Sequence, residues 1–337
     1  MTVPASVDAL IDQLLAFDEA AEIARIADRI REYLRRHLRR RGLVVAMSGG
    51  IDSSVCAALA VEAVGRDKVF GVLMPERDSS SDSLAKGELL AAHLGIQYAV
   101  QDIAPTLEAI GCYRWRDEAI RNVFPDYGEG WKNKIVIAGG TSGQINHFKL
   151  VVADPSGRLL EQRLGLREYL QIVAATNFKQ RIRKTLEFFH ADRLNYAVVG
   201  TPNRVEYDQG FFVKNGDGSA DLKPIAHLYK SQVYALARHM KLPAPICTAT
   251  PTTDTYSLAQ GQDEFYYSLP YKEMDLALWH YNEGLPASTL ARRLQMTEQQ
   301  VRYIFEDIEA KRRATAPLHW SALMIEPVSG PVPKPTT

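Results

Sequence analysis

A short glycine-containing turn constrains the fold of this chain more than any other feature. Residues 46–54 read Ala-Met-Ser-Gly-Gly-Ile-Asp-Ser-Ser, between an apolar run typical of a β-strand (43–47) and one typical of an α-helix (53–64). Consecutive glycines let the backbone approach an anion closely. The following helix presents unpaired N–H groups and the positive end of its dipole. The pattern therefore predicts a strand–turn–helix unit that binds a phosphate, with an ordinary glycine turn as the alternative.

The same order of strand and helix recurs along the chain. Further strands are predicted at 69–74, 96–100 and 196–199, and further helices at 83–94, 105–122, 166–190 and 229–240. This alternation predicts an α/β fold with a doubly wound, Rossmann-like, mostly parallel sheet. Because ligands bind beyond the carboxyl ends of the strands in such sheets, we expect the turn at Ser48 and the residues after Val199 to face one crevice.

Other segments lie outside this alternation. Residues 123–165 contain Pro125, several glycines and two β-like runs (135–138 and 148–153), so they predict an inserted β-element. The remaining predicted elements are N-terminal helices within 1–41, with Ser6 and Asp18 as N-caps, and C-terminal helices at 271–283, 286–294 and 297–313 within 266–313. We expect one domain over 1–315 and a proline-rich tail over 316–337.

Composition narrows the class of protein. The chain has 337 residues, 46% of them hydrophobic, and a formal net charge of zero, so charge gives no reason to expect binding to nucleic acid or an anionic membrane. Its three cysteines (56, 112 and 247) form no C-x-x-C pair, which argues against a disulfide framework and a zinc knuckle. Neither a spanning apolar run nor a signal peptide is evident. We expect a globular protein of the cytoplasm.

Several blocks in this framework resemble one family. The turn Ser48-Gly-Gly-x-Asp-Ser resembles the SGGxDS loop of the ATP-pyrophosphatase superfamily, whose members cleave ATP between the α and β phosphates, and it lacks the Gly-Lys-Ser/Thr ending of the Walker loop. With it come VGTPNRVE (199–206), FFVKNGDGSADLKP (211–224), LYKSQ (228–232) and shorter matches at 177–183, 250–252 and 311–313. In this order the blocks resemble the NAD synthetase family, enzymes that amidate deamido-NAD.

The resemblance implies an ATP-dependent amide ligase. In this reaction the carboxylate of deamido-NAD attacks the α-phosphorus of ATP, pyrophosphate leaves, and ammonia then displaces AMP to give NAD. The implied metal ion is Mg²⁺, held by Asp52 and Glu206. The implied ATP-binding positions are Ser48, Gly49, Gly50, Asp52, Ser53, Ser54, Thr201, Lys230 and Thr252.

Other positions match those that handle the acceptor. The implied substrate-binding residues are Asn177, Arg181, Lys214, Asp221 and Lys311. Lys230 and Asp52 would take part in catalysis, and Asp217 would accept a proton from ammonium near the adenylate. Residues 249–264 are polar and lack an apolar period, so they predict a lid that keeps water away from the adenylate.

The chain differs from many family members in two respects: the segment before Leu43 and the residues expected near the carboxylate substrate. About 42 residues precede Leu43, too few for the glutaminase domain that many members carry, so we expect free ammonia or a separate glutaminase. The resemblance also implies a homodimer. Because Gln180 and Ala310 are atypical of the acceptor side, a ligase that adenylates a different carboxylate is the alternative. Residues 286–301 resemble a helix-turn-helix, but the zero net charge argues against DNA binding.

Overall fold

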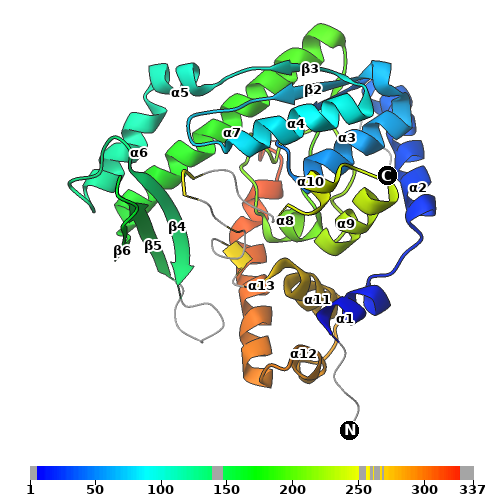
Figure 1. Cartoon of the computed structure of the whole chain (residues 1–337). Coiled ribbons are helices and arrows are strands. Elements are labelled where there is room, and N and C mark those ends of the chain that lie inside the picture. Colours follow the sequence, from blue (N-terminus) through cyan, green and yellow to red (C-terminus); the bar gives the residue numbers. More distant parts are fainter. Residues whose placement is uncertain are drawn as a thin grey trace.

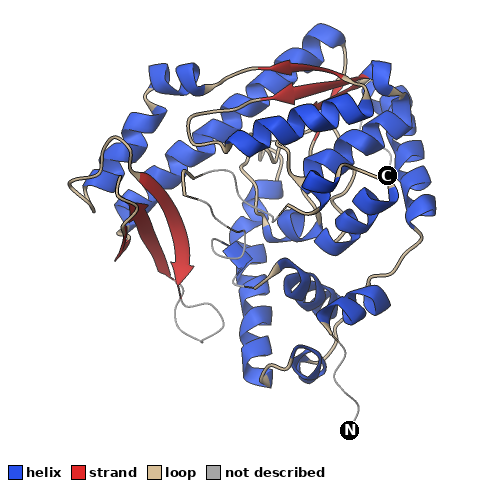
Figure 2. Cartoon of the chain, viewed as in Figure 1, coloured by secondary structure: helices blue, strands red, loops and turns tan. Residues whose placement is uncertain are grey.

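The fold is taken from a computed structural model. It describes residues 6–138, 147–249, 256–258, 261, 266, 267 and 269–326. In this described part, no helix has the length and apolar character needed to cross a membrane. Figure 2 shows helices around a small central sheet, with a second sheet beside them.

The central sheet confirms the predicted α/β fold. Its strands are β1 (Leu43–Ala46), β2 (Val69–Leu73), β3 (Gln97–Val100) and β7 (Ala197–Val199), in the order β3-β2-β1-β7 and all parallel. Val44 pairs with Phe70 on one side and with Val198 on the other. Because both faces of a parallel sheet are covered, β1, β2 and β7 read as nearly continuous apolar runs, whereas β3 at the edge is mostly exposed.

Helices cover both faces of this sheet (Figure 1). The helices that precede β7 are α1 (Val7–Leu14), α2 (Glu19–Glu32), η1 (Tyr33–Leu38), α3 (Ile51–Val64), η2 (Arg66–Lys68), α4 (Ser81–Leu94), α5 (Ala104–Ile110), α6 (Cys112–Arg121) and α7 (Leu166–Leu194). Those that follow it are α8 (Arg204–Gln209), α9 (Lys230–His239), α10 (Ala244–Cys247), α11 (Tyr271–Asn282), α12 (Ala287–Leu294) and α13 (Glu298–His319).

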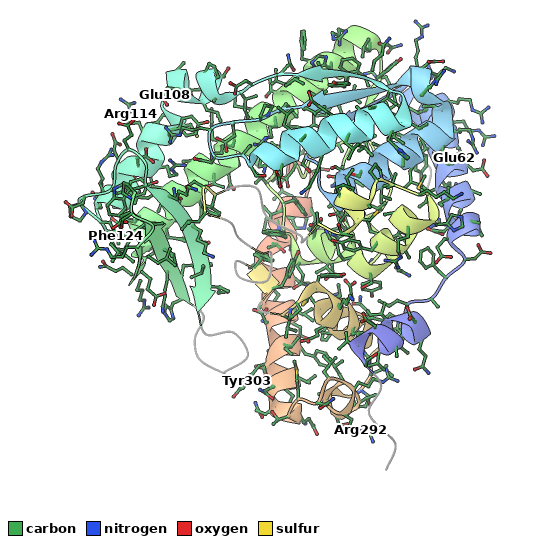
Figure 3. All side chains as sticks on the ribbon, viewed as in Figure 1. Glu62, Glu108, Arg114, Phe124, Arg292 and Tyr303 are labelled. Carbon is green, nitrogen blue, oxygen red and sulfur yellow. The ribbon has the colours of Figure 1, made fainter. Side chains whose placement is uncertain are left out.

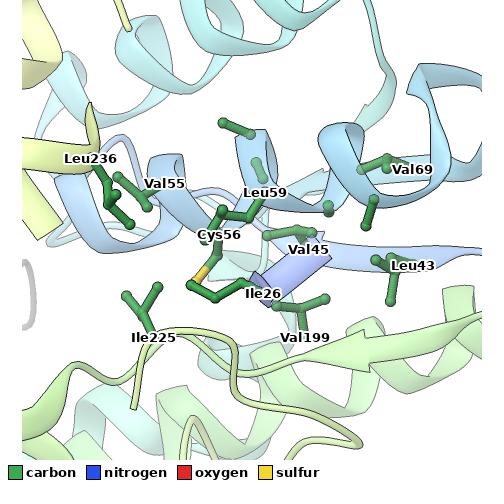
Figure 4. Close-up of a cluster of buried hydrophobic side chains, with 14 of the residues drawn as sticks. Ile26, Leu43, Val45, Val55, Cys56, Leu59, Val69, Val199, Ile225 and Leu236 are labelled. Atoms are coloured by element: carbon green, nitrogen blue, oxygen red, sulfur yellow. The ribbon is translucent and has the colours of Figure 1, made fainter. Parts of the chain in front are cut away.

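Alternate residues of β1 build two separate cores. Val45 belongs to a cluster with α2, α3 and α9, whereas Val44 belongs to a cluster with α5, α6 and α7. Figure 4 shows the first cluster, in which Val55 and Leu59 of α3 lie near Ile26 of α2. Side chains of a strand alternate between its two faces, so each core fixes α3 or α7 against the sheet.

Local rules place most helix ends. Ser6 accepts a hydrogen bond from the N–H of Ala9, and Asp18 accepts one from the N–H of Ala21, as expected for N-caps. The single helix expected over 105–122 is wrong, because α5 ends and α6 begins around Gly111, whose φ is +88°. Glycine adopts this left-handed conformation without the steric cost that a side chain carries.

The segment 123–165 contains a three-stranded antiparallel sheet. The strands are β4 (Lys132–Ala138), β5 (His147–Ala153) and β6 (Leu159–Arg163), in the order β4-β5-β6. The sequence predicts the first two strands but not β6. This sheet lies beside α6 and α7, apart from the central sheet (Figure 1), and packs on Ile120 and Ile172 of those helices. We refer to β4–β6 as the inserted sheet.

The C-terminal helices form a third packed unit with α1. Leu290 and Ala291 of α12 and Val301 and Ile304 of α13 are buried in a cluster with α1 and α11. The apolar residues of the segment that resembles a helix-turn-helix therefore pack in this cluster. Figure 3 labels Arg292 of α12 at this end of the molecule. Helix α13 continues past Pro317 to His319, so the tail begins later than residue 316.

Candidate active site

A cavity of about 1060 Å³ opens at the carboxyl ends of β1, β2 and β7. Ser48, Gly49, Gly50, Asp52 and Ser53 line it from the turn after β1, and they lie opposite the segments that follow β7. The other described walls come from the β2–α4 loop, from one side of α7 and from β4 and β5 of the inserted sheet. The crevice predicted from the strand order is therefore present, and a single cavity connects all these segments.

The turn after β1 needs a glycine at position 49. Gly49 has a φ of +76°, and a Cβ there would lie 2.6 Å from the Ser83 carbonyl oxygen of α4. Ser48 Oγ accepts a hydrogen bond from the Gly50 N–H at 3.3 Å, and Ser53 Oγ donates one to the Gly50 carbonyl at 3.0 Å. Gly50 is the N-cap of α3 and offers no side chain to its first N–H groups. These groups are available to an anion in the cavity.

Lys230 and Asp52 form an ion pair across the crevice. Lys230 Nζ pairs with Asp52 Oδ2, and the lysine side chain is only 4% exposed. Asn203 Nδ2 donates to Asp52 Oδ1 at 3.2 Å, while the Asn203 backbone N–H donates to Glu206 Oε2 at 3.1 Å. Burial alone would lower the pKa of Lys230, but Asp52 and Glu206 outweigh it and raise that pKa. The lysine is a fixed positive charge between two carboxylates.

The two carboxylates fit part of a metal site. In the described ranges, no group of three or more His, Cys, Asp or Glu side chains gathers to hold a metal ion. Asp52 and Glu206 both line the cavity, and Asn203 contacts both of them. Mg²⁺ is usually held by one or two carboxylates together with phosphate oxygens and water. The pair therefore suits Mg²⁺ that arrives with a nucleotide.

Asp275 of α11 holds the start of α9, where Lys230 lies. Its carboxylate accepts hydrogen bonds from the backbone N–H groups of Lys230 and Ser231, at 3.2 and 2.7 Å, and from Ser231 Oγ at 2.7 Å. Burial raises the pKa of Asp275 to about 6. The sequence pattern does not reveal this role, because Asp275 caps a helix that lies 45 residues earlier in the chain.

Replacing Asp275 with alanine is expected to lower the free energy of unfolding by about 2–4 kcal/mol, because hydrogen bonds to a charged acceptor each contribute about 1.5–3 kcal/mol. Urea denaturation followed by circular dichroism measures the change. The matched control is Asp67→Ala, since the Asp67 side chain is 96% exposed and the expected change stays within about 0.5 kcal/mol. Equal midpoints for the two variants would contradict this role.

Residues of α7 and the 210–218 turn line the other half of the cavity. Asn177 and Asp217 are among them, as are Lys184 and Glu187, which form a buried ion pair at 2.6 Å. Asp217 Oδ1 accepts a hydrogen bond from the Val213 N–H at 2.8 Å, and burial raises the pKa of Asp217. Lys184 and Glu187 are not among the residues predicted from the sequence, where their one signal is the i, i+3 spacing on a helix.

Some predicted ATP-binding residues lie at the cavity and others do not. Thr201 and Lys230 line it. Ser54 is not among the described lining residues, because it is buried and its Oγ donates to the Gly50 carbonyl at 2.8 Å. Thr252 lies outside the described residues. Of the predicted lid (249–264), Ala249 and Tyr256–Leu258 line the cavity, whereas 250–255, 259, 260 and 262–264 are not described.

Four of the predicted substrate-binding residues are not among the described lining residues. Lys214 Nζ donates to the carbonyls of Pro317 and Trp320 at the end of α13, and Arg181 Nε donates to the Lys214 carbonyl at 3.3 Å. These two side chains are therefore linked to the end of α13.

The other two hold backbone around the site. Asp221 Oδ2 accepts the Val198 N–H of β7 at 2.7 Å, so it covers the edge of the central sheet. Lys311 Nζ donates to the Tyr266 carbonyl at 2.6 Å and pairs with Asp307. Because Tyr266 lines the cavity, Lys311 supports its wall from behind.

The parallel sheet and the SGGxDS turn place the chain in the ATP-pyrophosphatase superfamily. The family model described as NAD synthase matches residues 22–123 and 146–314. An NH(3)-dependent NAD(+) synthetase of Rhizobium meliloti is 56% identical over 315 residues, which cover 93% of this chain and 94% of the relative. A protein of the same description from Thermotoga neapolitana is 39% identical over 76% of this chain and 81% of its own length.

Solved structures agree in fold. The NMN synthetase of Francisella tularensis aligns with a TM-score of 0.63 at 20% identity, over 92% of this chain and 99% of its own. The NH3-dependent NAD synthetase of Campylobacter jejuni aligns with a TM-score of 0.58 at 21% identity, over 92% and 100%. This chain belongs to the NAD synthase family, whose members are ligases that form a C–N bond.

Proposed function

We propose that this chain is an ammonia-dependent NAD synthetase that converts deamido-NAD, ATP and ammonia into NAD, AMP and pyrophosphate. One observation carries the proposal. A single cavity joins the SGGxDS turn and the Lys230–Asp52 pair to the wall formed by Asn177 and Asp217. A nucleoside triphosphate and a second large substrate can therefore meet in one cavity.

In the first step, an oxygen of the acceptor carboxylate forms a bond to the α-phosphorus and the bond to pyrophosphate breaks. The N-terminal N–H groups of α3 would donate to the departing phosphates, and Ser48 and Ser53 line the cavity beside them. Lys230 supplies a point charge at the same place. Mg²⁺, when bound by Asp52 and Glu206, would neutralise phosphate charge.

In the second step, ammonia attacks the acyl carbon of the adenylate, and the bond to AMP breaks. The solution form of ammonia at neutral pH is mostly ammonium, so a proton must be removed before attack. Asp217 lines the acceptor side of the cavity, and its raised pKa makes its carboxylate a better proton acceptor than an exposed aspartate. Tyr256 and Tyr266 help to keep water from the adenylate.

Asp217→Asn is expected to lower the rate at saturating ammonium by about 10²-fold, because general-base catalysis typically contributes about 10²–10⁴. The measurement is the rate of NAD formation against ammonium concentration, with melting temperature as a check on folding. A full rate at saturating ammonium would show that Asp217 is only a turn residue. Asp154→Asn, at an exposed turn of the inserted sheet, is the matched control.

The direct test supplies the purified chain with ATP, MgCl₂, ammonium and deamido-NAD and follows NAD and AMP by chromatography. Equal amounts of NAD and AMP are expected. A second series replaces deamido-NAD with other carboxylates. AMP formation with one of these, and no NAD from deamido-NAD, would favour the alternative ligase that adenylates a different acceptor.

The ammonia source, assembly and location remain part of this proposal. We infer free ammonia, or a separate glutaminase subunit, as the nitrogen source. A homodimer is expected by likeness to the family, and a cytoplasmic location is expected from the three scattered cysteines.

A further inference from the structure

A group of buried charged side chains lies behind the β2–α4 loop. Lys179 Nζ pairs with Glu76 Oε1 at 2.9 Å and with Asp78 Oδ2 at 2.5 Å. Arg116 pairs with the same Asp78 oxygen, and the Tyr113 hydroxyl donates to Glu76 Oε2 at 2.7 Å. Lys179, Glu76, Asp78 and Arg116 are each at most 5% exposed. We call these five residues the Lys179 network.

The network connects two parts of the molecule. Its carboxylates come from the loop 75–80, whereas its donors come from α6 (Tyr113 and Arg116) and α7 (Lys179). Among the described residues that line the cavity, Asp78 is the one member of the network; the other four lie behind it. Tyr113, Arg116 and Lys179 therefore affect the shape of the cavity by holding the loop 75–80.

The loop itself faces the cavity. Arg77, Ser79 and Ser80 line it, together with Asp78. The loop is closed by hydrogen bonds from the Ser79 N–H to the Glu76 carbonyl at 3.0 Å and from the Asp78 N–H to Glu76 Oε2 at 3.1 Å. The Arg77 guanidinium lies 3.8 Å from the centroid of the Tyr113 ring. The loop is thus folded around Glu76, whose carboxylate the network holds.

Stability alone does not explain the Lys179 network, because burying its charges has a large desolvation penalty. Removing charges from water costs several kcal/mol per ion, and a protein in which apolar residues of similar volume replace a buried ion pair is often equally stable. Burial opposes the ionisation of Asp78, but Lys179 and Arg116 outweigh it and hold the pKa of Asp78 below its ordinary value. Charged hydrogen bonds differ from apolar packing in their geometric specificity, because each donor fits one arrangement of the two carboxylates.

We propose that Lys179, Arg116 and Tyr113 are positioning residues that hold the loop 75–80 in the conformation that receives ATP. The loop follows β2, directly beside the SGGxDS turn after β1, and α4 at its end contacts Gly49. A displaced loop would therefore alter the nucleotide side of the cavity first. The inference rests on the proposed function only in taking ATP as the ligand.

The test uses Lys179→Met, with Lys272→Met as the control, since Lys272 pairs with Asp8 at the surface and is not among the described cavity residues. Lys179→Met is expected to raise the KM for ATP by about tenfold or more, because a small displacement of the residues that position a substrate can lower the rate about 10²-fold. The change in the KM for deamido-NAD should be much smaller, because the loop lies on the nucleotide side of the cavity. Hydrogen exchange of the backbone over 75–80 should become faster. Lys272→Met should change neither quantity.

Two further variants keep the proposal falsifiable if Lys179→Met does not fold. Tyr113→Phe keeps the ring beneath Arg77 and removes two hydrogen bonds, the one that the hydroxyl donates to Glu76 and the one that it accepts from the Arg77 N–H, so a rise of about threefold in the KM for ATP is expected. Lys179→Met combined with Glu76→Gln also removes the negative charge that Lys179 pairs with, and its KM for ATP should still lie above that of the wild type because the loop has lost the Lys179 contact.

A merely structural role predicts a different result. If these variants lower the melting temperature but leave both the KM for ATP and exchange over 75–80 unchanged, the proposal is wrong. Calorimetric titration with a non-hydrolysable ATP analogue separates this outcome from failure of the proposed function. Analogue binding that weakens in Lys179→Met supports the network even if the wild type makes no NAD.

Discussion

Lys230→Met is expected to lower kcat/KM for ATP by about 10³-fold, because removing one preorganised donor to a developing charge typically costs about 10²–10³. Lys230 is buried, its charge is fixed by Asp52, and its backbone is held by Asp275 at the start of α9. Methionine has a similar length and no charge, so the variant removes the cation with little change in packing volume. Initial rates of AMP formation measure the effect.

Loss of stability must be separated from loss of rate in this variant. Breaking a buried ion pair costs about 3–5 kcal/mol, so Lys230→Met should also unfold more easily. Lys230→Met combined with Asp52→Asn should recover part of that stability without recovering the rate. The control is Lys68→Met, at an exposed position of η2, which should leave both unchanged. Recovery of the rate in the double variant would contradict a role for Lys230 at the phosphates.

Asp52→Asn is expected to lower kcat/KM for ATP by about 10²–10³-fold and to raise the Mg²⁺ concentration needed for half-maximal rate. Asparagine keeps the size of the side chain but removes the charge that would bind Mg²⁺ and that pairs with Lys230. Initial rates across a range of MgCl₂ concentrations at fixed ATP measure both effects.

The control for this variant comes from the same helix. Glu62 lies on an exposed turn of α3 (Figure 3) and is not among the described lining residues, so Glu62→Gln should leave the rate and its Mg²⁺ dependence unchanged. An Asp52→Asn variant with a normal Mg²⁺ requirement would remove the proposed metal role. A fall in kcat/KM alone would then be explained by the altered Lys230.

The sequence predicts the features that depend on local pattern. The turn at Ser48 is recognisable because strand, consecutive glycines and helix follow one another directly, and Ser6 and Asp18 are recognisable as N-caps. The parallel sheet follows from the alternation of apolar runs. In contrast, β6 (Leu159–Arg163) is mostly exposed and lacks an apolar alternation, so its sequence carries little strand pattern.

The parts of the site that the sequence does not predict depend on distant contacts. Lys179 is a charged residue on a helix, and its burial follows from Glu76 and Asp78, which belong to a loop about a hundred residues earlier in the chain. Asp275 holds α9 from another helix in the same way. Helical periodicity gives the face on which a residue lies, but not which partner of opposite charge meets it there.

Transfer of oxygen from the acceptor to AMP tests the central claim most directly. Deamido-NAD labelled with ¹⁸O in its carboxylate is converted with ATP, Mg²⁺ and ammonium, and the products are examined by mass spectrometry. If the carboxylate attacks the α-phosphorus, each AMP carries one labelled oxygen and appears in equal amount with NAD and pyrophosphate. Label in inorganic phosphate together with ADP, or unlabelled AMP, would contradict adenylation of the acceptor by this enzyme.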